Sequence, residues 1–324
     1  MTPPARLIHA WRIGSPWLAL LAPLAWLYAL LAAINRRRQQ NRAIRLNPSR
    51  RVIVIGNITL GGSGKTTLAG WLAEDLRKRG KSVAIISKGY GRVSRLPQPA
   101  LADPNPARFG DEPAMLAWLF PSTPVWVCDD RLSALQTVAA DYLICDDGLQ
   151  DYRFSPRVEI GLIDGHSGFA NVRLFPQGIL REPVKRLQKC ALVIQQGGEQ
   201  LIPPAQGSFQ LEITGFTNLR SSEHKSLSRA LDDWRDQPLH LCCGLANNQR
   251  VFNQIDALGL RADKHPFPDH HPYCAGDIDH PGQVLLTAKD AIKCLPFVHQ
   301  RCWRIDTQVN MPTNLAKAIR KLTA

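Results

Sequence analysis

A glycine-rich segment that ends in one lysine and two threonines, TLGGSGKTT, occupies residues 59–67. Its glycines allow a backbone turn whose N–H groups converge on one anion. Behind them, Lys65 can reach the β- and γ-phosphates of a nucleotide, and the Thr66 hydroxyl can bind Mg²⁺. The spacing predicts a phosphate-binding loop for a nucleoside triphosphate, which we expect to be ATP. The residues expected to contact it are Thr59, Gly61, Gly62, Ser63, Gly64, Lys65, Thr66 and Thr67.

The elements on either side of this loop support that interpretation. Residues 51–56, RVIVIG, are rich in β-branched side chains and predict a buried strand. Leu68, Leu72 and Leu76 then follow at helical spacing. The alternative, a chance glycine-rich turn, does not require a strand before it and a helix after it. Thr59 stands where the usual motif has its first glycine, which weakens the match but leaves the mechanism intact.

Two acidic pairs come directly after apolar runs that predict strands. Phosphoryl transfer needs carboxylates at the ends of neighbouring strands to hold Mg²⁺ and to orient the reactants. Asp146 and Asp147 are the stronger candidates, because Gly148 allows a tight turn after them and Gln150 adds a polar ligand. The other pair, at 129–130, is more typical of a helix N-terminus.

A third acidic position precedes a proline. Asp111 and Glu112 stand before Pro113, which suits the first turn of a helix. Two interpretations remain open from the residues alone. Asp111 either caps the helix, or it lies near the γ-phosphate and acts as a general base.

Histidines concentrate in HPFPDHHPYCAGD, residues 265–277. Zinc binding by His265, His270 and His271 with Asp269 and Cys274 is one alternative, but their spacing matches no familiar zinc set. We favour a histidine paired with a carboxylate for proton handling. A histidine-rich surface loop is the remaining alternative.

The N-terminus carries an apolar run, residues 17–34, followed by arginines at 36–38. The run is long enough to cross a hydrocarbon core of about 30 Å, and its tryptophans and tyrosine suit an interfacial anchor equally well. A cleaved signal peptide and a buried core helix are the alternatives. The arginine cluster argues against export, so we predict a membrane anchor with a cytoplasmic body.

Composition narrows the class of partner. The 324 residues are 44% hydrophobic and 21% charged, which indicates a globular chain with a sizeable core. The net charge of +13 favours anionic partners. No zinc-finger spacing, RNA-binding aromatic signature or basic zipper is present, so we expect no nucleic acid. A membrane surface and a phosphorylated substrate remain, and the eight scattered cysteines are typical of reduced cytoplasmic thiols.

The order of elements predicts an α/β fold. Strand and helix patterns alternate from about 51 to 200, as in a P-loop NTPase-type parallel sheet with helices on both faces. A second strand–turn–helix unit starts near residue 239, and residues 315–322 predict a final helix. We therefore expect an N-terminal membrane anchor at 1–38, a P-loop kinase domain at 39–215, and a smaller α/β domain with the C-terminal helix at 216–324.

An ordered set of motifs resembles the tetraacyldisaccharide 4'-kinase family. These motifs are GNITLGGSGKTT (56–67), SKGYG (87–91), GDEP (110–113), DDGLQ (146–150), FPQGILREP (175–183), FPDHH (267–271) and TAKDAIK (287–293). The family's own loop has threonine at position 59, which explains the missing glycine. The resemblance extends from the N-terminus to about residue 294.

The resemblance implies an ATP-dependent kinase that phosphorylates the 4'-hydroxyl of a tetraacyl glucosamine disaccharide 1-phosphate, giving lipid IVA, at the cytoplasmic face of the bacterial inner membrane. It implies Asp111 as the general base and His270 as its partner, with a second domain that closes to bring His270 to the active site. Lys65, Asp146 and Asp147 complete the expected catalytic set. The implied metal ligands are Thr66, Asp146, Gln150 and Glu182, with either Asp146 or Asp147 in direct contact. The implied phosphate or substrate contacts are Lys88, Arg131 and Arg181.

Three positions depart from the family pattern. Lys88 replaces an arginine and loses its bidentate fork. Asp151 stands where histidine is frequent, and Ala288 where glutamate is common. These departures affect individual contacts and leave the phosphoryl-transfer set complete.

Two other classes of P-loop protein are alternatives to a kinase. A membrane-associated partitioning ATPase carries a second lysine just before the paired glycines, where this chain has Leu60. A P-loop GTPase needs an Asn-Lys-x-Asp motif that recognises guanine, and TAKDA at 287–291 resembles this motif only weakly. Both alternatives are therefore disfavoured.

Overall fold

The computed structural model describes the chain except residues 1–4, 48, 63, 90–97, 101–104 and 156. It divides into two compact units. The first comprises residues 1–88, 122–210 and 311–324, and the second comprises 89–121 and 211–310. The sequence placed 89–121 with the kinase domain and 311–324 with the smaller domain, whereas the structure groups both segments the other way round.

Packing contacts explain why residues 89–121 belong to the second unit and residues 311–324 to the first. Helix α5 (Asp111–Leu119) packs against α9 (Ala288–Cys294) in the second unit. The C-terminal helix α10 (Thr313–Leu322) joins the first unit, where Arg320 forms an ion pair of 2.6 Å with Asp75. Such contacts between distant segments leave no local signal in the sequence.

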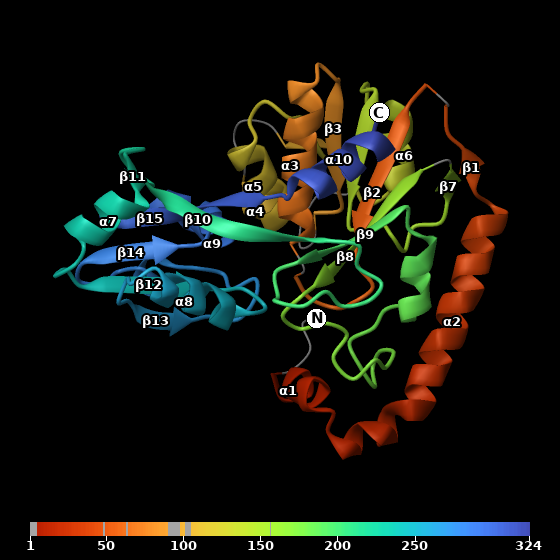
Figure 1. The fold of residues 1–324 in the computed structure, drawn as a ribbon, viewed down its shortest axis with the longest axis horizontal. Helices are drawn as coiled ribbons and strands as arrows, with labels where there is room; N and C mark the ends of the chain where they lie inside the picture. The colour runs from red at the N-terminus through yellow and green to blue at the C-terminus, as the bar shows by residue number, and fades with distance from the viewer. Residues whose placement is uncertain (1–4, 48, 63, 90–97, 101–104, 156) are drawn as a thin grey trace. The chain divides into compact units, whose positions relative to one another are not determined.

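The first unit is built on a parallel sheet with the order β10-β9-β8-β2-β6-β3-β5 (Figure 1). Its strands are β2 (Arg51–Gly56), β3 (Val83–Ser87), β5 (Val125–Val127), β6 (Tyr142–Asp146), β8 (Val158–Asp164), β9 (Leu192–Gln196) and the start of β10 (Ser208–Asn218). A short parallel pair, β1 (Ile44–Arg45) with β7 (Phe154–Ser155), lies apart from it. The central strands are buried, as their continuous apolar runs require.

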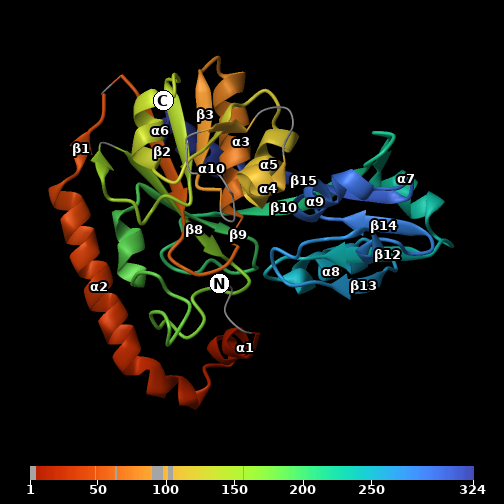
Figure 2. The same ribbon diagram turned by 180° about the vertical axis from the view of Figure 1, so that it is seen from behind.

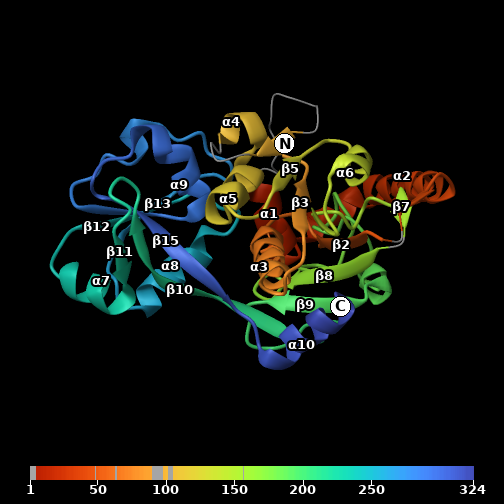
Figure 3. The same cartoon turned by 90° about the horizontal axis from the view of Figure 1, so that it is seen from above.

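Helices cover both faces of this sheet. Val52 and Val54 of β2 pack with Ala134 and Leu135 of α6 (Arg131–Thr137) in one core cluster. Helix α3 (Lys65–Lys78) contacts β2, β3 and β6, and Figure 3 shows it on the side opposite α6. The short helix η2 (Val184–Lys189) contributes Leu187 to a further apolar cluster.

The described residues before the sheet form three helical segments. They are α1 (Ala5–Ile13), the 3₁₀ helix η1 (Pro16–Leu21) and the long α2 (Ala22–Asn41), which Figure 1 draws in red. Pro23 lies in the first turn of α2, where its missing N–H costs nothing. The stretch 16–41 is long and apolar enough to cross a membrane, and little of it is buried. This exposure argues against a buried core helix.

The second unit has its own sheet, with the order β13-β12-β14-β15-β10 and β11 beside β10 (Figure 2). The strands are β10, β11 (His224–Ser226), β12 (Leu239–Cys243), β13 (Asp263–Pro266), β14 (Gln283–Leu286) and β15 (Cys302–Asn310). Its helical segments are α4 (Pro106–Phe109), α5, α7 (Leu227–Asp233), α8 (Asn248–Ala257), η3 (Ala275–Asp277), α9 and η4 (Leu295–Phe297), and β4 (Gln98–Ala100) also falls within it.

Two apolar clusters flank the second sheet. Leu241 and Leu285 pack with Phe252 and Ile255 of α8 on one side. Cys242 and Leu286, which alternate with them along the strands, pack with Ala291 and Ile278 on the other. The parallel strands β13, β12 and β14 therefore end at one common edge, where loops can gather functional residues.

Candidate active site

The glycine-rich loop joins β2 to α3, as expected. Gly61 (φ 102°) and Gly64 (φ 80°) adopt the left-handed backbone that glycine favours, and α3 begins at Lys65. Ser63, an expected nucleotide contact, lies outside the described residues. Thr59 forms an isolated bridge with Leu180, so the loop is tied to the segment that carries Arg181 and Glu182. The start of α3 presents backbone N–H groups suited to a phosphate.

Lys65 is held at the base of this loop. Its Nζ donates to Asn57 Oδ1 at 3.2 Å and lies 3.7 Å from Asp147 Oδ1. Asn57 was not predicted as a site residue, although it stands in the quoted GNITLGG motif. The lysine is thus buried but paired, as a buried charge must be.

Asp147 occupies a strained backbone position with φ 50°. Arg181 Nη1 donates to its carboxylate at 3.0 Å. Burial raises the pKa of Asp147, but the positive charges of Lys65 and Arg181 outweigh this effect and hold the pKa well below its usual value. The structure therefore joins three expected residues in one ionised triad.

Asp146 ends β6 beside the first turn of α3. Thr66 Oγ1 donates to Asp146 Oδ2 at 3.1 Å. Arg131 is buried to 2% exposure, and its Nη2 donates to the carbonyls of Asp146 (2.6 Å) and Asp147 (2.8 Å). In this structure, Arg131 fixes the backbone turn that presents both carboxylates.

Gln150 and Glu182 form a neighbouring polar group. Gln150 Nε2 donates to Glu182 Oε2 at 3.2 Å and to the Asn57 carbonyl at 3.0 Å. Tyr152 OH donates to Glu182 Oε1 at 2.5 Å, and Arg186 Nε donates to Tyr152 OH at 2.8 Å. Tyr152 and Arg186 were not predicted, because neither falls within a quoted motif.

The oxygen atoms of these side chains are suitable ligands for a magnesium ion. Mg²⁺ prefers oxygen ligands and usually keeps several waters. The Thr66 hydroxyl and the Asp146 carboxylate are adjacent oxygen donors at the loop, and Glu182 offers another carboxylate. Among the described residues, a Cβ placed on Gly61 or Gly62 would meet no atom within 4 Å, so the loop faces open space.

Lys88 follows β3 in the same unit. Desolvation, together with the positive charge of Arg131, lowers its pKa. The negative charges of Asp151 and Asp147 raise this pKa, so Lys88 is close enough to interact electrostatically with both carboxylates. Asp151 is held by Arg153 at 2.7 Å, which gives this departure from the family pattern a structural partner.

The second unit brings together the two other expected catalytic residues. Asp111 Oδ2 lies 2.9 Å from His270 Nδ1. Gly110 takes the N-cap position of α5, so Asp111 does not cap the helix and its carboxylate is directed to the histidine. His270 follows β13 with φ 62°, a left-handed conformation uncommon for histidine.

Charged neighbours surround this pair. Lys293 Nζ lies 3.9 Å from Asp111 Oδ2, and Asp269 Oδ2 lies 3.7 Å from His270 Nε2. Lys289 Nζ in turn donates to Asp269 at 2.9 Å. Burial raises the pKa of Asp111, but the hydrogen bond with His270 and the charge of Lys293 lower it more, so the carboxyl stays ionised. The lysines come from TAKDAIK, which places this motif beside the pair.

The residues of the alternative zinc set have different partners in the structure. His270 pairs with Asp111, and His271 Nε2 lies 3.0 Å from Asp277 Oδ2. His265 instead lies beside His240 and His280. The histidine–carboxylate interpretation agrees with this geometry better than the zinc interpretation does.

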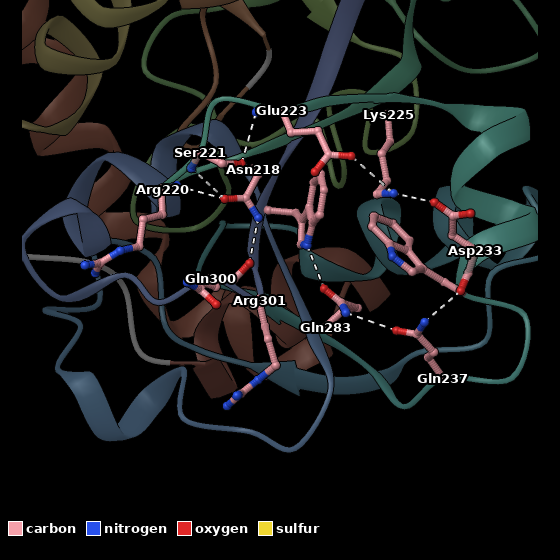
Figure 4. A pocket seen from close by; sticks show the side chains of 12 residues that line it. Asn218, Arg220, Ser221, Glu223, Lys225, Asp233, Gln237, Gln283, Gln300 and Arg301 are labelled. Carbon is pink, nitrogen blue, oxygen red and sulfur yellow. Dashed lines mark hydrogen bonds and ion pairs between the residues drawn. The ribbon is translucent and has the colours of Figure 1, made fainter.

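A hollow elsewhere on the second unit contains none of the expected site residues (Figure 4). Its lining side chains largely pair with one another: Trp303 Nε1 donates to Gln283 at 2.7 Å, and Gln283 donates to Gln237 at 3.0 Å. Lys225 and Asp233 form an ion pair on another wall. The residues expected to carry out the chemistry thus lie at the phosphate loop and at the Asp111–His270 pair, and not in this hollow.

A parallel sheet whose glycine-rich loop opens a helix, with acidic residues at the end of a neighbouring strand, defines a P-loop kinase fold. The family model "LpxK: Tetraacyldisaccharide-1-P 4'-kinase" matches residues 17–324. The chain therefore belongs to the tetraacyldisaccharide 4'-kinase family, and the family predicted from the motifs is confirmed.

Individual relatives agree. The chain is 36% identical over 317 residues to a tetraacyldisaccharide 4'-kinase of Methylobacillus flagellatus, covering 95% of this chain and 93% of that protein. It is 39% identical over 309 residues to that of Pseudomonas aeruginosa, covering 92% and 91%. The crystal structure of "apo" form LpxK from Aquifex aeolicus in complex with ATP matches with a TM-score of 0.75 at 25% identity, covering 95% of this chain and 99% of that one. The predicted fold class is confirmed.

Proposed function

We propose that this chain transfers the γ-phosphoryl group of ATP to the 4'-hydroxyl of a tetraacyl glucosamine disaccharide 1-phosphate, giving lipid IVA. The observation that carries the proposal is the phosphate loop itself, with Lys65 paired to Asp147 and Thr66 bonded to Asp146. Membership of a 4'-kinase family supplies the acceptor and its position.

The first unit provides the nucleotide site. The phosphates would be lined by Thr59, Gly61, Gly62, Gly64, Thr66 and Thr67, and Ser63, which lies outside the described residues, is a further expected contact. Lys65 neutralises charge on the β- and γ-phosphates, and Arg181, now bound to Asp147, can turn toward the transferred group. Thr66 and Asp146 would be the nearest ligands of a Mg²⁺ ion, with Gln150 and Glu182 behind them, and the ion would supply positive charge to offset that of the phosphates. Lys88 and Arg131 keep this edge positive.

The second unit provides the base. A sugar hydroxyl is a poor nucleophile until its proton has a receiver, and the ionised Asp111 carboxylate can accept it. His270 orients that carboxylate through the 2.9 Å contact, and Lys293 favours its ionised form. Because phosphoryl transfer depends on positioning and charge more than on covalent chemistry, these roles suffice.

We also propose that the N-terminal segment binds the cytoplasmic face of the inner membrane. Large apolar side chains of η1 and α2 are exposed, among them Leu20 (80%) and Trp26 (75%). The other side of the segment packs on the protein: Tyr28 OH donates to the Arg181 carbonyl at 3.0 Å, and the Trp11 and Phe175 rings meet edge to face. A helix bound in this way suits the interface better than a span, with the basic residues 36–38 facing anionic lipid.

The chemistry of the proposed substrate accounts for both the apolar N-terminal segment and the positive net charge. Its acyl chains stay in the bilayer while its phosphorylated headgroup must reach a basic site, and the net charge of +13 suits such a headgroup. We propose no nucleic-acid partner. The domain roles follow the structural units: anchor and nucleotide site in the first, proton acceptor in the second.

The acceptor position is tested with two disaccharides in detergent micelles, the natural 1-phosphate and its 4'-deoxy analogue. We expect label from γ-labelled ATP on the first acceptor only, and a second phosphate monoester on its distal sugar by phosphorus NMR. Equal labelling of the 4'-deoxy analogue would assign the reaction to another hydroxyl.

A further inference from the structure

Three histidines of the second unit, far apart in the chain, meet at one place. His240 lies in β12, His265 lies in β13, and His280 lies in the loop between η3 and β14. One nitrogen from each ring lies within 4.8 Å of those of the other two. His240 is buried and the other two are half-buried, so the cluster is part of the folded unit. Neither the motif set nor the proposed phosphoryl transfer uses it.

Two of the three histidines lie at the other end of the strands from the proposed base. His240 is the second residue of β12 and His280 precedes β14, so both lie toward the amino ends of parallel strands, whereas His265 is the third of the four residues of β13. His270 follows the carboxyl end of β13, and Lys289 follows that of β14.

Hydrogen bonds prepare the rings as ligands. His240 Nε2 donates to the Pro281 carbonyl at 2.7 Å, which leaves the lone pair on Nδ1, and this atom lies 3.1 Å from His265 Nε2. His280 makes a hydrogen bond with the backbone of Asp277. Backbone carbonyls that fix the outer nitrogen of a histidine are the usual support of a metal-binding ring.

One buried nitrogen of the cluster lacks a hydrogen-bond partner among the described residues. His280 Nε2 is buried and has no hydrogen-bond partner there. A buried polar atom left unpaired loses the hydrogen bonds that it makes in water, so such atoms usually have a ligand or a water as partner. A metal ion bound by this nitrogen removes the deficit.

We propose that His240, His265 and His280 bind one zinc ion, with the Asp263 carboxylate as fourth ligand. Asp263 Oδ2 lies 3.8 Å from His240 Nδ1 on the neighbouring strand. At Zn–N bonds of about 2.0–2.1 Å, tetrahedral ligand nitrogens lie roughly 3.3 Å apart, close to the His240–His265 separation. The His280 ring stacks on His265 with centroids 4.0 Å apart, so binding requires this ring to rotate until Nε2 points at the ion.

Zinc is the dication of choice because imidazole nitrogens and one carboxylate form a borderline ligand set, unlike the oxygen set at the phosphate loop. The bound ion ties β12, β13 and the loop before β14 to one another. Its role is structural, since four protein ligands leave no open position for a substrate.

The test uses the full-length chain without a polyhistidine tag, titrated with Co²⁺ and then with Zn²⁺. We expect one Co²⁺ per chain with the visible absorption of a tetrahedral site, displaced by one Zn²⁺, and a higher melting temperature in the presence of zinc. His280→Gln and His265→Gln should weaken Co²⁺ binding by about 100-fold or more. His224→Gln is the matched control, because His224 is an exposed histidine of the same unit outside the cluster.

Asp263→Ala gives a second variant that the fold tolerates, since this side chain is 82% exposed. We expect it to weaken binding by about tenfold and to alter the Co²⁺ spectrum. Absence of Co²⁺ binding by the wild-type chain, or equal binding by the wild type and His280→Gln, would overturn the proposal.

Discussion

The carboxylate of Asp111 lies 2.9 Å from Nδ1 of His270, although 159 positions separate the two residues in the chain. Asp111 opens α5 behind a glycine with φ 87°, and His270 has a left-handed backbone of its own. Strained backbone persists where the surrounding structure fixes it, and it concentrates at functional sites. The pair is therefore built into the second unit as a positioned carboxylate.

Removing this carboxylate should stop turnover without removing ATP binding. Asp111→Asn keeps the size of the side chain but cannot accept the hydroxyl proton, so we expect kcat to fall by about 10²–10⁴-fold. Steady-state kinetics and nucleotide titration measure the two effects. Glu112→Gln is the matched control, because it removes the neighbouring charge on the same helix. Near-normal turnover of Asp111→Asn would exclude it as the base.

The pH dependence of the reaction should shift when His270 is changed. A base acts when deprotonated, and the hydrogen bond with His270 helps to hold the pKa of Asp111 below its usual value. In His270→Gln, burial remains while this lowering contact is weakened, so the pKa of Asp111 rises. We expect the acid limb of kcat/KM to move to higher pH, measured across pH profiles of both proteins. An unchanged acid limb would mean that His270 does not tune Asp111.

Arg181 should contribute to phosphoryl transfer, because it lies beside the phosphate loop. It pairs with Asp147 at 3.0 Å, and its side chain is partly exposed. Arg181→Ala should lower kcat/KM by about 10² because a charge that can face the transferred group is lost. Arg173→Ala, an exposed arginine of the same segment, should stay near wild type. Equal effects of the two changes would indicate a general loss of surface charge.

The exposed face of α2 should control membrane binding. Leu27 and Leu31 are more than half exposed and lie one turn apart. Changing both to glutamine removes apolar area worth about 1 kcal/mol or more per side chain, so partitioning onto anionic vesicles should fall by at least about tenfold. Leu201→Gln, another exposed leucine of the same unit, is the control. Vesicle flotation that does not distinguish the two proteins would refute the anchor.

Arg186 should be a stability residue of the first unit. It is almost fully buried and pairs with Glu159 at 2.8 Å, beside Glu182. Arg186→Ala leaves buried carboxylates without this partner, and we expect the free energy of unfolding to fall by about 3–5 kcal/mol in urea denaturation. Arg235→Ala, which breaks an exposed pair, should leave the midpoint nearly unchanged. A small effect of Arg186→Ala would show that Arg157, which also pairs with Glu159, compensates.

The parts of the site that were predictable are local in the sequence. A strand, a glycine-rich turn and a helix follow one another, so Lys65, Thr66 and the acidic turn after β6 could be placed from spacing alone. Asp111 could be proposed but not separated from a helix cap, because its partner lies on a strand loop distant in the chain. The structure excludes the helix cap, because Gly110 takes that position, and it directs the Asp111 carboxylate to His270.

The unpredictable parts depend on packing between distant segments. Helix α5 joins the second unit through α9, and α10 joins the first through the Arg320–Asp75 pair. The histidine cluster depends on the register of β12 with β13, in which His240 lies opposite Asp263. No periodicity within one segment carries such information.

The most direct test of the account is single-turnover transfer of label from γ-labelled ATP to the disaccharide 1-phosphate in micelles with Mg²⁺, for the wild type, Lys65→Ala and Asp111→Asn. We predict a doubly phosphorylated lipid from the wild type and almost none from either variant, with ATP still bound by Asp111→Asn. Transfer that persists in Lys65→Ala, or ATP hydrolysis without a labelled lipid in the wild type, would contradict the assignment of this loop to a 4'-kinase reaction.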